Sequence, residues 1–149
     1  MKKRKILPPT FFMSTILIIV IAHFIFPLVQ FIYFPLNLIG LLFFILGGIL
    51  NLLADKDFKR YNTTVKPFEY STKLVTNGVF SISRNPMYLG MILFLFGESI
   101  LLGSLGPFLI TIIFMLLIYF TFIKVEEGML LEKFNGEYVN YKNKVRRWI

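Results

Sequence analysis

The sequence predicts an all-α, polytopic membrane protein: four transmembrane helices followed by a carboxy-terminal amphipathic helix at the membrane interface. Two observations support this fold class. Hydrophobic residues make up 56% of the 149 positions, above the roughly 45–50% of soluble domains even when glycine is counted. The 16 Lys and Arg residues all lie outside the long apolar runs, in three segments: before the first run, between the second and third, and after the fourth. We expect one membrane-embedded domain over residues 1–149.

The four predicted spans are apolar runs separated by short polar segments. A span needs about 17–25 residues, because an α-helix rises 1.5 Å per residue and must cross the hydrocarbon core. We expect Pro27 to kink the first span. The third is short unless Pro86 and Ser104 are included. The runs cover residues 11–34, 36–54, 87–104 and 107–123.

The basic residues predict the orientation. With four spans, the amino terminus, the loop 55–85 and the tail 124–149 share one side, and all Lys and Arg lie there. The two opposite turns, near residues 30–37 and 103–106, carry no charge. Because Lys and Arg concentrate in cytoplasmic loops, we expect both termini in the cytoplasm, with the bilayer rather than nucleic acid as the partner of the basic surface. The short chain and the lack of a targeting signal favour a prokaryotic inner membrane.

The tail predicts an interfacial helix. Its apolar residues recur at steps of three and four, which places them on one helical face with most Lys and Arg off it. Trp148 and the tyrosines are then expected at headgroup level, with a weak point at Gly136. The apolar positions are Leu131, Phe134, Tyr138, Tyr141, Val145 and Trp148.

Missing residue types narrow the chemistry. The chain has no cysteine and one histidine, so disulfides, thiolate nucleophiles and histidine clusters are excluded, and no metal site is expected. It also lacks a phosphate loop and a G-x-G-x-x-G turn. Direct displacement on an already activated donor, such as a methyl sulfonium, remains possible because the protein then only aligns the reactants and excludes water.

The stretch "SISRNPMYLG", residues 81–90, has two interpretations. Asn85 followed by Pro86 is a helix-start signal, and Arg84 suits a side chain that reaches the headgroups. The same helix start beside an arginine is also an anion site. Neither helix-start signal accounts for Tyr88.

Glu126 and Glu127 directly follow the fourth span. They either complement the dipole of a following helix or hold a cationic ligand below the headgroups. The second interpretation requires that the third and fourth spans pair, which brings these acids close to the start of the third span.

Polar residues and glycines inside the spans have structural interpretations, although roles of Glu98 and His23 in function are left open. An intramembrane carboxyl is costly and suggests function, but Glu98 lies deep, and His23 is the kind of residue that hydrogen-bonds between helices. Expected partners of Glu98 are Ser14, Thr15, Asn51 or Ser99. Residues expected at close helix contacts are Gly47, Gly48, Asn51, Gly90 and Gly97.

Three segments in order, "LVTNGVFSISRNPMYLG" (74–90), "EE" (126–127) and "FNGEYVNYKNKVRRW" (134–148), resemble the isoprenylcysteine carboxyl methyltransferase family, whose wider group includes phospholipid methyltransferases. The resemblance covers about the last half of the chain. It implies an integral membrane enzyme that uses S-adenosylmethionine, with a cofactor pocket on the cytoplasmic side and a lipophilic acceptor that enters from the bilayer. It implies cofactor contacts at Thr72, Lys73, Leu74, Val75, Phe80, Asn85, Pro86, Met87, Tyr88, Glu126 and Glu127, and positioning roles for Arg84, Asn85, Tyr88 and Glu127.

The chain departs from the family pattern at several positions. Asn85 replaces a frequent histidine, Val145-Arg146 replaces Val-Pro, and Phe122 stands where the eukaryotic prenylcysteine enzymes have an arginine. The acceptor is therefore left open between a carboxylate, a thiol and an amine. Phospholipid N-methylation, a nicotinamide-dependent membrane reductase and a non-enzymatic helical scaffold are the alternatives, and the oligomeric state is open.

Overall fold

The computed structural model describes residues 7–61 and 72–149, and these residues form helices and connections without a β-strand. The predicted all-helical class is confirmed for them. Three helical stretches are long and apolar enough to cross a membrane, and a shorter apolar helix accompanies them, so the count of four spans stays a prediction. The helices are α1 (Pro8–Ile25), α2 (Ile39–Arg60), α3 (Pro86–Leu102), α4 (Leu105–Ile118) and α5 (Lys124–Lys144).

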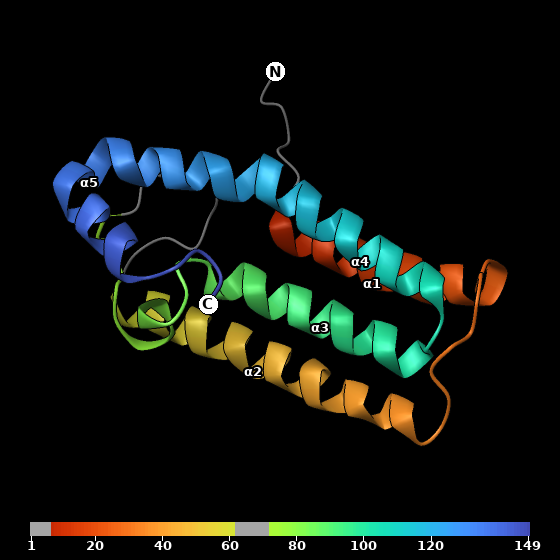
Figure 1. The fold of residues 1–149 in the computed structure, drawn as a ribbon. Coiled ribbons are helices and arrows are strands. Elements are labelled where there is room, and N and C mark those ends of the chain that lie inside the picture. Colours follow the sequence, from red (N-terminus) through yellow and green to blue (C-terminus); the bar gives the residue numbers. More distant parts are fainter. Residues whose placement is uncertain (1–6, 62–71) are drawn as a thin grey trace.

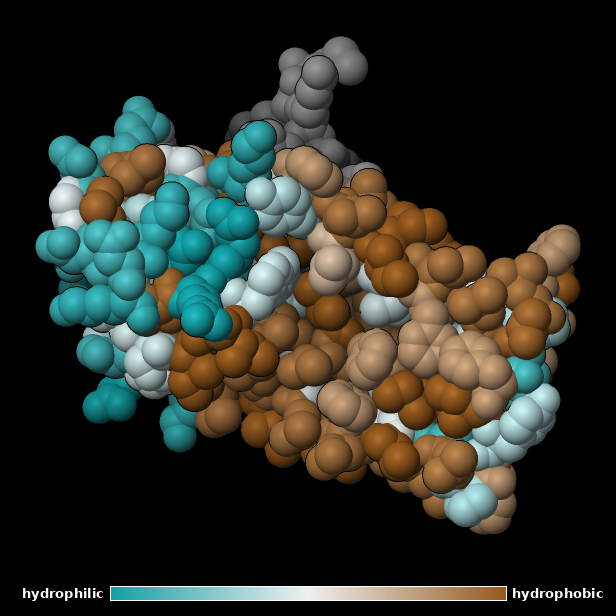
Figure 2. All heavy atoms as spheres, in the orientation of Figure 1, coloured by the Kyte–Doolittle hydropathy of each residue, from teal (hydrophilic) through white to brown (hydrophobic). Residues whose placement is uncertain are grey.

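Helix α3 lies at the centre of the bundle, with α2 along one side and α1 and α4 along the other (Figure 1). The main apolar core lies where α1, α3 and α4 meet, around Ile19, Leu95, Phe114 and Ile118. Many large apolar side chains on the outer faces are exposed, and they cover most of the length of the bundle (Figure 2). Such a surface suits contact with lipid.

The first helix is shorter than the apolar run predicted. Helix α1 ends at Ile25, and Phe26 leaves the helical conformation with φ −136° and ψ 69°. The expectation that Pro27 kinks a continuing helix is wrong. Proline disfavours the α conformation of the residue before it and has no N–H to donate, so the helix stops and an irregular connection leads toward α2.

Glycines bring α2 and α3 into close contact. A Cβ on Gly47 would lie 2.6 Å from the carbonyl oxygen of Gly90, and a Cβ on Gly40 would lie 2.5 Å from that of Gly97. These distances are too short for any side chain, so the glycines allow the two backbones to approach. The expected contact at Gly48 is wrong, because a Cβ there meets nothing within 4 Å.

The tail differs from its prediction in two respects. Helix α5 kinks at Asn135, which has φ 38°, next to the weak point expected at Gly136, and it ends at Lys144 rather than continuing to Trp148. Tyr138 and Tyr141 are buried instead of lying at headgroup level. The tail folds back on the loop before α3 because both tyrosine hydroxyls find partners there, as described below.

The polar residues within the helices differ in how their hydrogen bonds are satisfied. His23 agrees with its expected structural role, since its Nδ1 lies 2.7 Å from Ser104 Oγ. Glu98 does not form the bonds expected of it. Oε2 of Glu98 is buried and has no hydrogen-bond partner among the described residues. The expected partners Thr15, Asn51 and Ser99 each donate to a carbonyl of their own helix.

Candidate functional site

Charged side chains gather at one end of the bundle, which we call the polar end (Figure 2). It consists of the last turn of α2, the described part of the loop before α3 (72–85), the first turn of α3, the first turns of α5, and the segment 136–149. The opposite end, at the connections 26–38 and 103–104, we call the far end.

The start of α3 is built as the sequence predicts, but Asn85 does not cap it. Asn85 has φ −131° and makes no side-chain cap hydrogen bond, and Pro86 occupies the first helical turn. The Asn85 Nδ2 instead points toward Glu127 Oε1 at 3.5 Å and the Arg147 carbonyl oxygen at 3.3 Å. The helix start therefore presents a side-chain amide to the acidic pair rather than to its own backbone.

The acidic pair follows a π-helical segment, Tyr119–Ile123, which joins α4 to α5. Such segments are rare in proteins, and those that occur often lie at functional sites. Phe122 and Ile123 of this segment are buried in the core, which fixes the following turn. The segment thus anchors the turn that carries Glu126 and Glu127.

Tyr88 and Glu126 meet directly. The Tyr88 hydroxyl donates to Glu126 Oε1 at 2.8 Å, and the Tyr88 ring stacks at 6.4 Å on that of Phe122. Burial raises the pKa of Glu126 to about 7, although the hydrogen bond from Tyr88 acts in the opposite direction. A carboxyl of this kind changes its charge near neutral pH.

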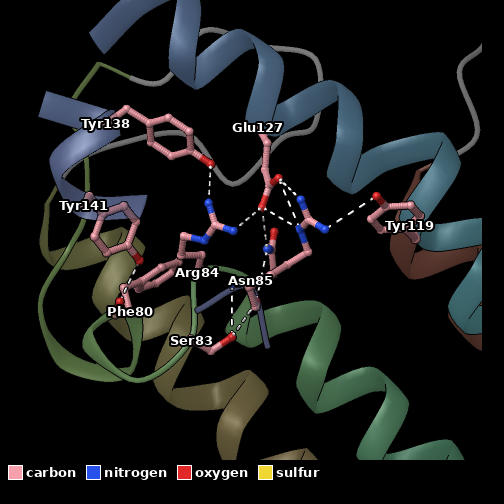
Figure 3. A network of polar contacts seen from close by, with 9 residues as sticks. Phe80, Ser83, Arg84, Asn85, Tyr119, Glu127, Tyr138 and Tyr141 are labelled. Atoms are coloured by element: carbon pink, nitrogen blue, oxygen red, sulfur yellow. Dashed lines mark hydrogen bonds and ion pairs between the residues drawn. The ribbon is translucent and has the colours of Figure 1, made fainter. Parts of the chain in front are cut away.

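Glu127 has a very different environment from its neighbour (Figure 3). Arg147 donates to both of its oxygens, from Nη2 at 2.8 Å and from Nε at 3.0 Å, and Nη2 of Arg84 lies 3.4 Å away. Burial alone would raise the pKa of Glu127, but Arg147, Arg84 and Asn85 together hold it below its ordinary value. Glu127 therefore stays ionised.

Two tyrosines of the folded-back tail complete this network (Figure 3). The Tyr138 hydroxyl lies 3.5 Å from Arg84 Nη1, and the Tyr141 hydroxyl donates to the Phe80 carbonyl at 2.6 Å. Burial raises the pKa of Tyr138 to about 12, so its phenol stays neutral and remains a hydrogen-bonding group. The tail is thereby held against the loop before α3.

A small apolar cluster lies beside the network, at the end of α2. Val75, Phe80 and Ala54 are buried there, and Met87 packs against them. Asp57 of α2 anchors the 3₁₀ turn Gly78–Ser81, because its Oδ2 accepts from the Val79 N–H at 3.1 Å. Gly78 begins this turn with φ 63°.

The structure brings together only part of the predicted set. Thr72 and Lys73 are exposed, Leu74 is half-buried, and Val75, Phe80 and Met87 belong to the apolar cluster. Pro86 is buried at the helix start. The residues that meet around the acidic pair are Arg84, Asn85, Tyr88, Glu126 and Glu127. Their role in cofactor binding stays a prediction.

Sequence reasoning missed Arg147, Tyr138 and Asp57. Arg147 lies in the tail segment 134–148 that carries the resemblance, but the helical-face argument treated it as a solvated charge. Tyr138 was assigned to the membrane interface. Nothing in the pattern around Asp57 distinguished it from an ordinary charge at the end of a helix.

Comparison with known protein families assigns the chain to one of them. A family model described as phospholipid methyltransferase matches residues 36–137. The chain belongs to the phospholipid methyltransferase family. The match includes residues 84–88 and the acidic pair, while Tyr138, Tyr141 and Arg147 lie beyond it.

Two curated relatives of this family member carry the same descriptive name. The chain is 47% identical over 74 residues to the protein-S-isoprenylcysteine O-methyltransferase of Saccharomyces cerevisiae, covering 48% of this chain and 30% of that protein. It is 32% identical over 118 residues to a probable protein-S-isoprenylcysteine O-methyltransferase of Oryza sativa subsp. japonica, covering 76% of this chain and 60% of that protein.

A solved structure shares the fold of this phospholipid methyltransferase family member. It is that of the eukaryotic intramembrane Ras methyltransferase, isoprenylcysteine carboxyl methyltransferase, with a TM-score of 0.65 and 29% identity. The alignment covers 95% of this chain and 51% of the other. The chain thus spans between 30% and 60% of the length of these relatives.

Proposed function

We propose that the chain is a membrane-bound methyltransferase that uses S-adenosylmethionine to methylate a lipophilic acceptor at the cytoplasmic face. The observation that carries this proposal is the meeting of the α3 start with the acidic pair, where Tyr88 donates to Glu126 at 2.8 Å. Family membership and the names of the relatives support the reaction type.

The residues around the pair fit such a cofactor. S-adenosylmethionine carries an ammonium and ribose hydroxyls, which need hydrogen-bond acceptors, and when bound it supplies an activated methyl group. Glu126 is an acceptor whose described partner is Tyr88, and Asn85 both donates and accepts. The reaction then requires no protein nucleophile, because the chain aligns the reactants and keeps water out.

The two carboxylates have different roles in this proposal. Glu127 is already neutralised by Arg147 and Arg84, so its charge is not available to a ligand. Glu126 has no arginine partner among the described residues and is the carboxylate that receives the ammonium or the ribose hydroxyls. Glu127 holds the surrounding segments together.

The acceptor is an isoprenylcysteine carboxylate in the leading form of the proposal, as in the names of the relatives. A phospholipid amine is the second candidate, favoured by the position of Phe122. Phe122 is buried against Tyr88, so the site has an apolar ring where the eukaryotic enzymes have an arginine that suits a carboxylate. Either acceptor approaches from the bilayer across the apolar helix faces.

The cytoplasmic orientation rests on charge. Helix α2 ends with Lys59 and Arg60 at the polar end, and Arg84 and Arg147 lie there as well. The described connections at the far end carry no Lys, Arg, Asp or Glu. Positive charge concentrates on the cytoplasmic side of membrane proteins, and this supports the proposal that the polar end and both termini face the cytoplasm.

Calorimetric titration in detergent tests the cofactor. We expect S-adenosylhomocysteine to bind the wild-type protein and a reduced nicotinamide not to bind. Affinity for S-adenosylhomocysteine should fall about tenfold or more in Glu126→Gln, because a charged hydrogen bond is lost. The matched control is Glu137→Gln, an exposed glutamate of the same helix. Binding of the nicotinamide instead would indicate a reductase, and folded protein that binds neither would indicate a scaffold.

The acceptor is tested separately, with radiolabelled S-adenosylmethionine. A farnesylated cysteine with a free carboxylate is compared with vesicles containing phosphatidylethanolamine. Label in an ester that base hydrolyses supports the carboxylate acceptor. Label in the headgroup amine supports the phospholipid acceptor.

A further inference from the structure

We propose that Arg147 is a positioning residue of the cofactor site, which acts through Glu127, and that the segment 145–149 is thereby part of that site. This inference rests on the proposed function. It goes beyond it by assigning a role to a residue that lies outside the matched family region and past the last helix.

The guanidinium of Arg147 grips Glu127 with a fork. Its Nη2 donates to Oε2 at 2.8 Å, and its Nε donates to Oε1 at 3.0 Å and to Oε2 at 3.2 Å. Two parallel hydrogen bonds fix the orientation of a carboxylate as well as its charge. The Glu127 side chain is 13% exposed and that of Arg147 is 33% exposed, so the carboxylate is the more sheltered partner.

The backbone of the same residue holds the loop before α3. The Arg147 carbonyl accepts from Ser83 Oγ at 3.2 Å and from Asn85 Nδ2 at 3.3 Å. Asn85 therefore contacts both ends of Arg147, the carbonyl directly and the guanidinium through Glu127. This arrangement fixes the amide of Asn85 relative to the acidic pair.

The guanidinium also contacts the π-helical segment. It lies 5.1 Å from the centre of the Tyr119 ring, and its Nη1 is 3.5 Å from the Tyr119 hydroxyl. Cation–π contact adds to the ion pair. Arg147 thus joins three segments that are distant in sequence: the π-helical segment, the acidic pair and the loop before α3.

Loss of this side chain leaves every proposed cofactor contact in place but releases their alignment. Glu127 would retain Arg84 at 3.4 Å and the Asn85 amide at 3.5 Å, two longer contacts without the fork. Because Glu126 is carried on the same helical turn, a shift of Glu127 moves the carboxylate that receives the ligand. Sites need such support to hold productive geometry.

The neighbouring Arg146 is a matched control. Both residues are arginines of the same segment, so replacement by alanine removes the same charge. The Arg146 side chain is exposed, and only its backbone carbonyl takes part, by accepting from the Arg84 N–H at 3.1 Å. That carbonyl is kept in Arg146→Ala.

The test is calorimetric binding of S-adenosylhomocysteine to the full chain in detergent. We expect Kd to rise about tenfold in Arg147→Ala, to stay within twofold of wild type in Arg146→Ala, and to be partly restored in Arg147→Lys, which keeps the charge without the fork. In a Glu127→Gln background, Arg147→Ala should add little, because residues that act through one another are not additive.

Each outcome of this experiment either supports or overturns the role proposed for Arg147. Equal affinities in Arg147→Ala and Arg146→Ala, or full additivity with Glu127→Gln, would overturn the inference while the wild-type binding upholds the proposed function. A wild-type protein that does not bind S-adenosylhomocysteine would overturn both. If Arg147→Ala does not fold, Arg147→Lys replaces it, and wild-type affinity in that variant would overturn the role of the fork.

Discussion

The two ends of the bundle close their helices by different means. At the far end the donors are neutral: Gln30 Nε2 donates to the Ile32 and Leu102 carbonyls, and Asn37 Nδ2 donates to the Leu101 carbonyl, each at 3.0 Å. At the polar end, two arginines and two carboxylates converge around the start of α3.

The difference distinguishes polar side chains that satisfy the ends of helices from charged side chains that suit a functional site. The last carbonyls of a helix lack partners within the helix, and the far end uses its amide donors to satisfy those of α3. At the polar end the polar side chains do not serve to cap α3, since Asn85 makes no cap hydrogen bond. Glu126 also has no arginine partner among the described residues. Perturbed charges of this kind concentrate at functional sites.

The largest effect should come from breaking the ion network at the polar end. Glu127→Ala leaves Arg84, whose side chain is 7% exposed, and Arg147 without their shared counter-charge. Removing one partner of a buried pair costs about 3 kcal/mol or more. Denaturant unfolding in detergent measures this loss, with the exposed Glu137→Ala as control. A loss within the range of the control would mean that the network is not structural.

The next effect is a pH dependence that Glu126 confers. Burial raises its pKa to about 7 in the folded protein, from an ordinary value of 4.5. Between these values the folded state binds more protons than the unfolded state, so stability should fall as pH rises from about 4.5 to 7, by up to about 3 kcal/mol.

Glu126→Gln provides the matched variant for this slope. Thermal unfolding at several pH values should show the decline in the wild-type protein, and a flatter profile in Glu126→Gln. Glu127 contributes with the opposite sign and at lower pH, because its pKa is lowered. An identical slope in both proteins would show that another group titrates.

A smaller effect, and one without consequence for the ligand, is expected at the far end. Gln30→Ala removes the donor to the Ile32 and Leu102 carbonyls, which should destabilise the fold by about 1–2 kcal/mol. Affinity for S-adenosylhomocysteine, measured by calorimetry, should stay unchanged. A parallel loss of affinity would show that the two ends are coupled and would weaken the distinction between them.

The smallest effect should come from the fully buried Ser104. Ser104→Ala removes the 2.7 Å hydrogen bond to His23, worth about 1 kcal/mol. The exposed Ser14→Ala, on the same helix as His23, should change the free energy of unfolding by less than about 0.5 kcal/mol. Equal effects of the two substitutions would indicate that the imidazole finds another partner.

Much of the polar end was predictable because its signals are local. The Asn-Pro helix start and the acids after the fourth apolar run are both sequence features. The structure has a helix beginning at Pro86 and a helix carrying both acids. The apolar residues of the tail gave a misleading signal. A spacing of three and four identifies one helical face, but it does not reveal whether lipid or protein covers that face.

By itself the sequence determined that the chain is built from apolar helices, that its positive charge is separated from them, and the family. These properties depend on composition and on neighbours a few residues apart. Only the tertiary structure decided that Tyr88 pairs with Glu126, that two arginines hold Glu127, and that the tail folds back so that Arg147 reaches the site. The partners in these contacts are separated by between 20 and 64 residues, and burial and long-range pairing, rather than local pattern, set the charge of each acid.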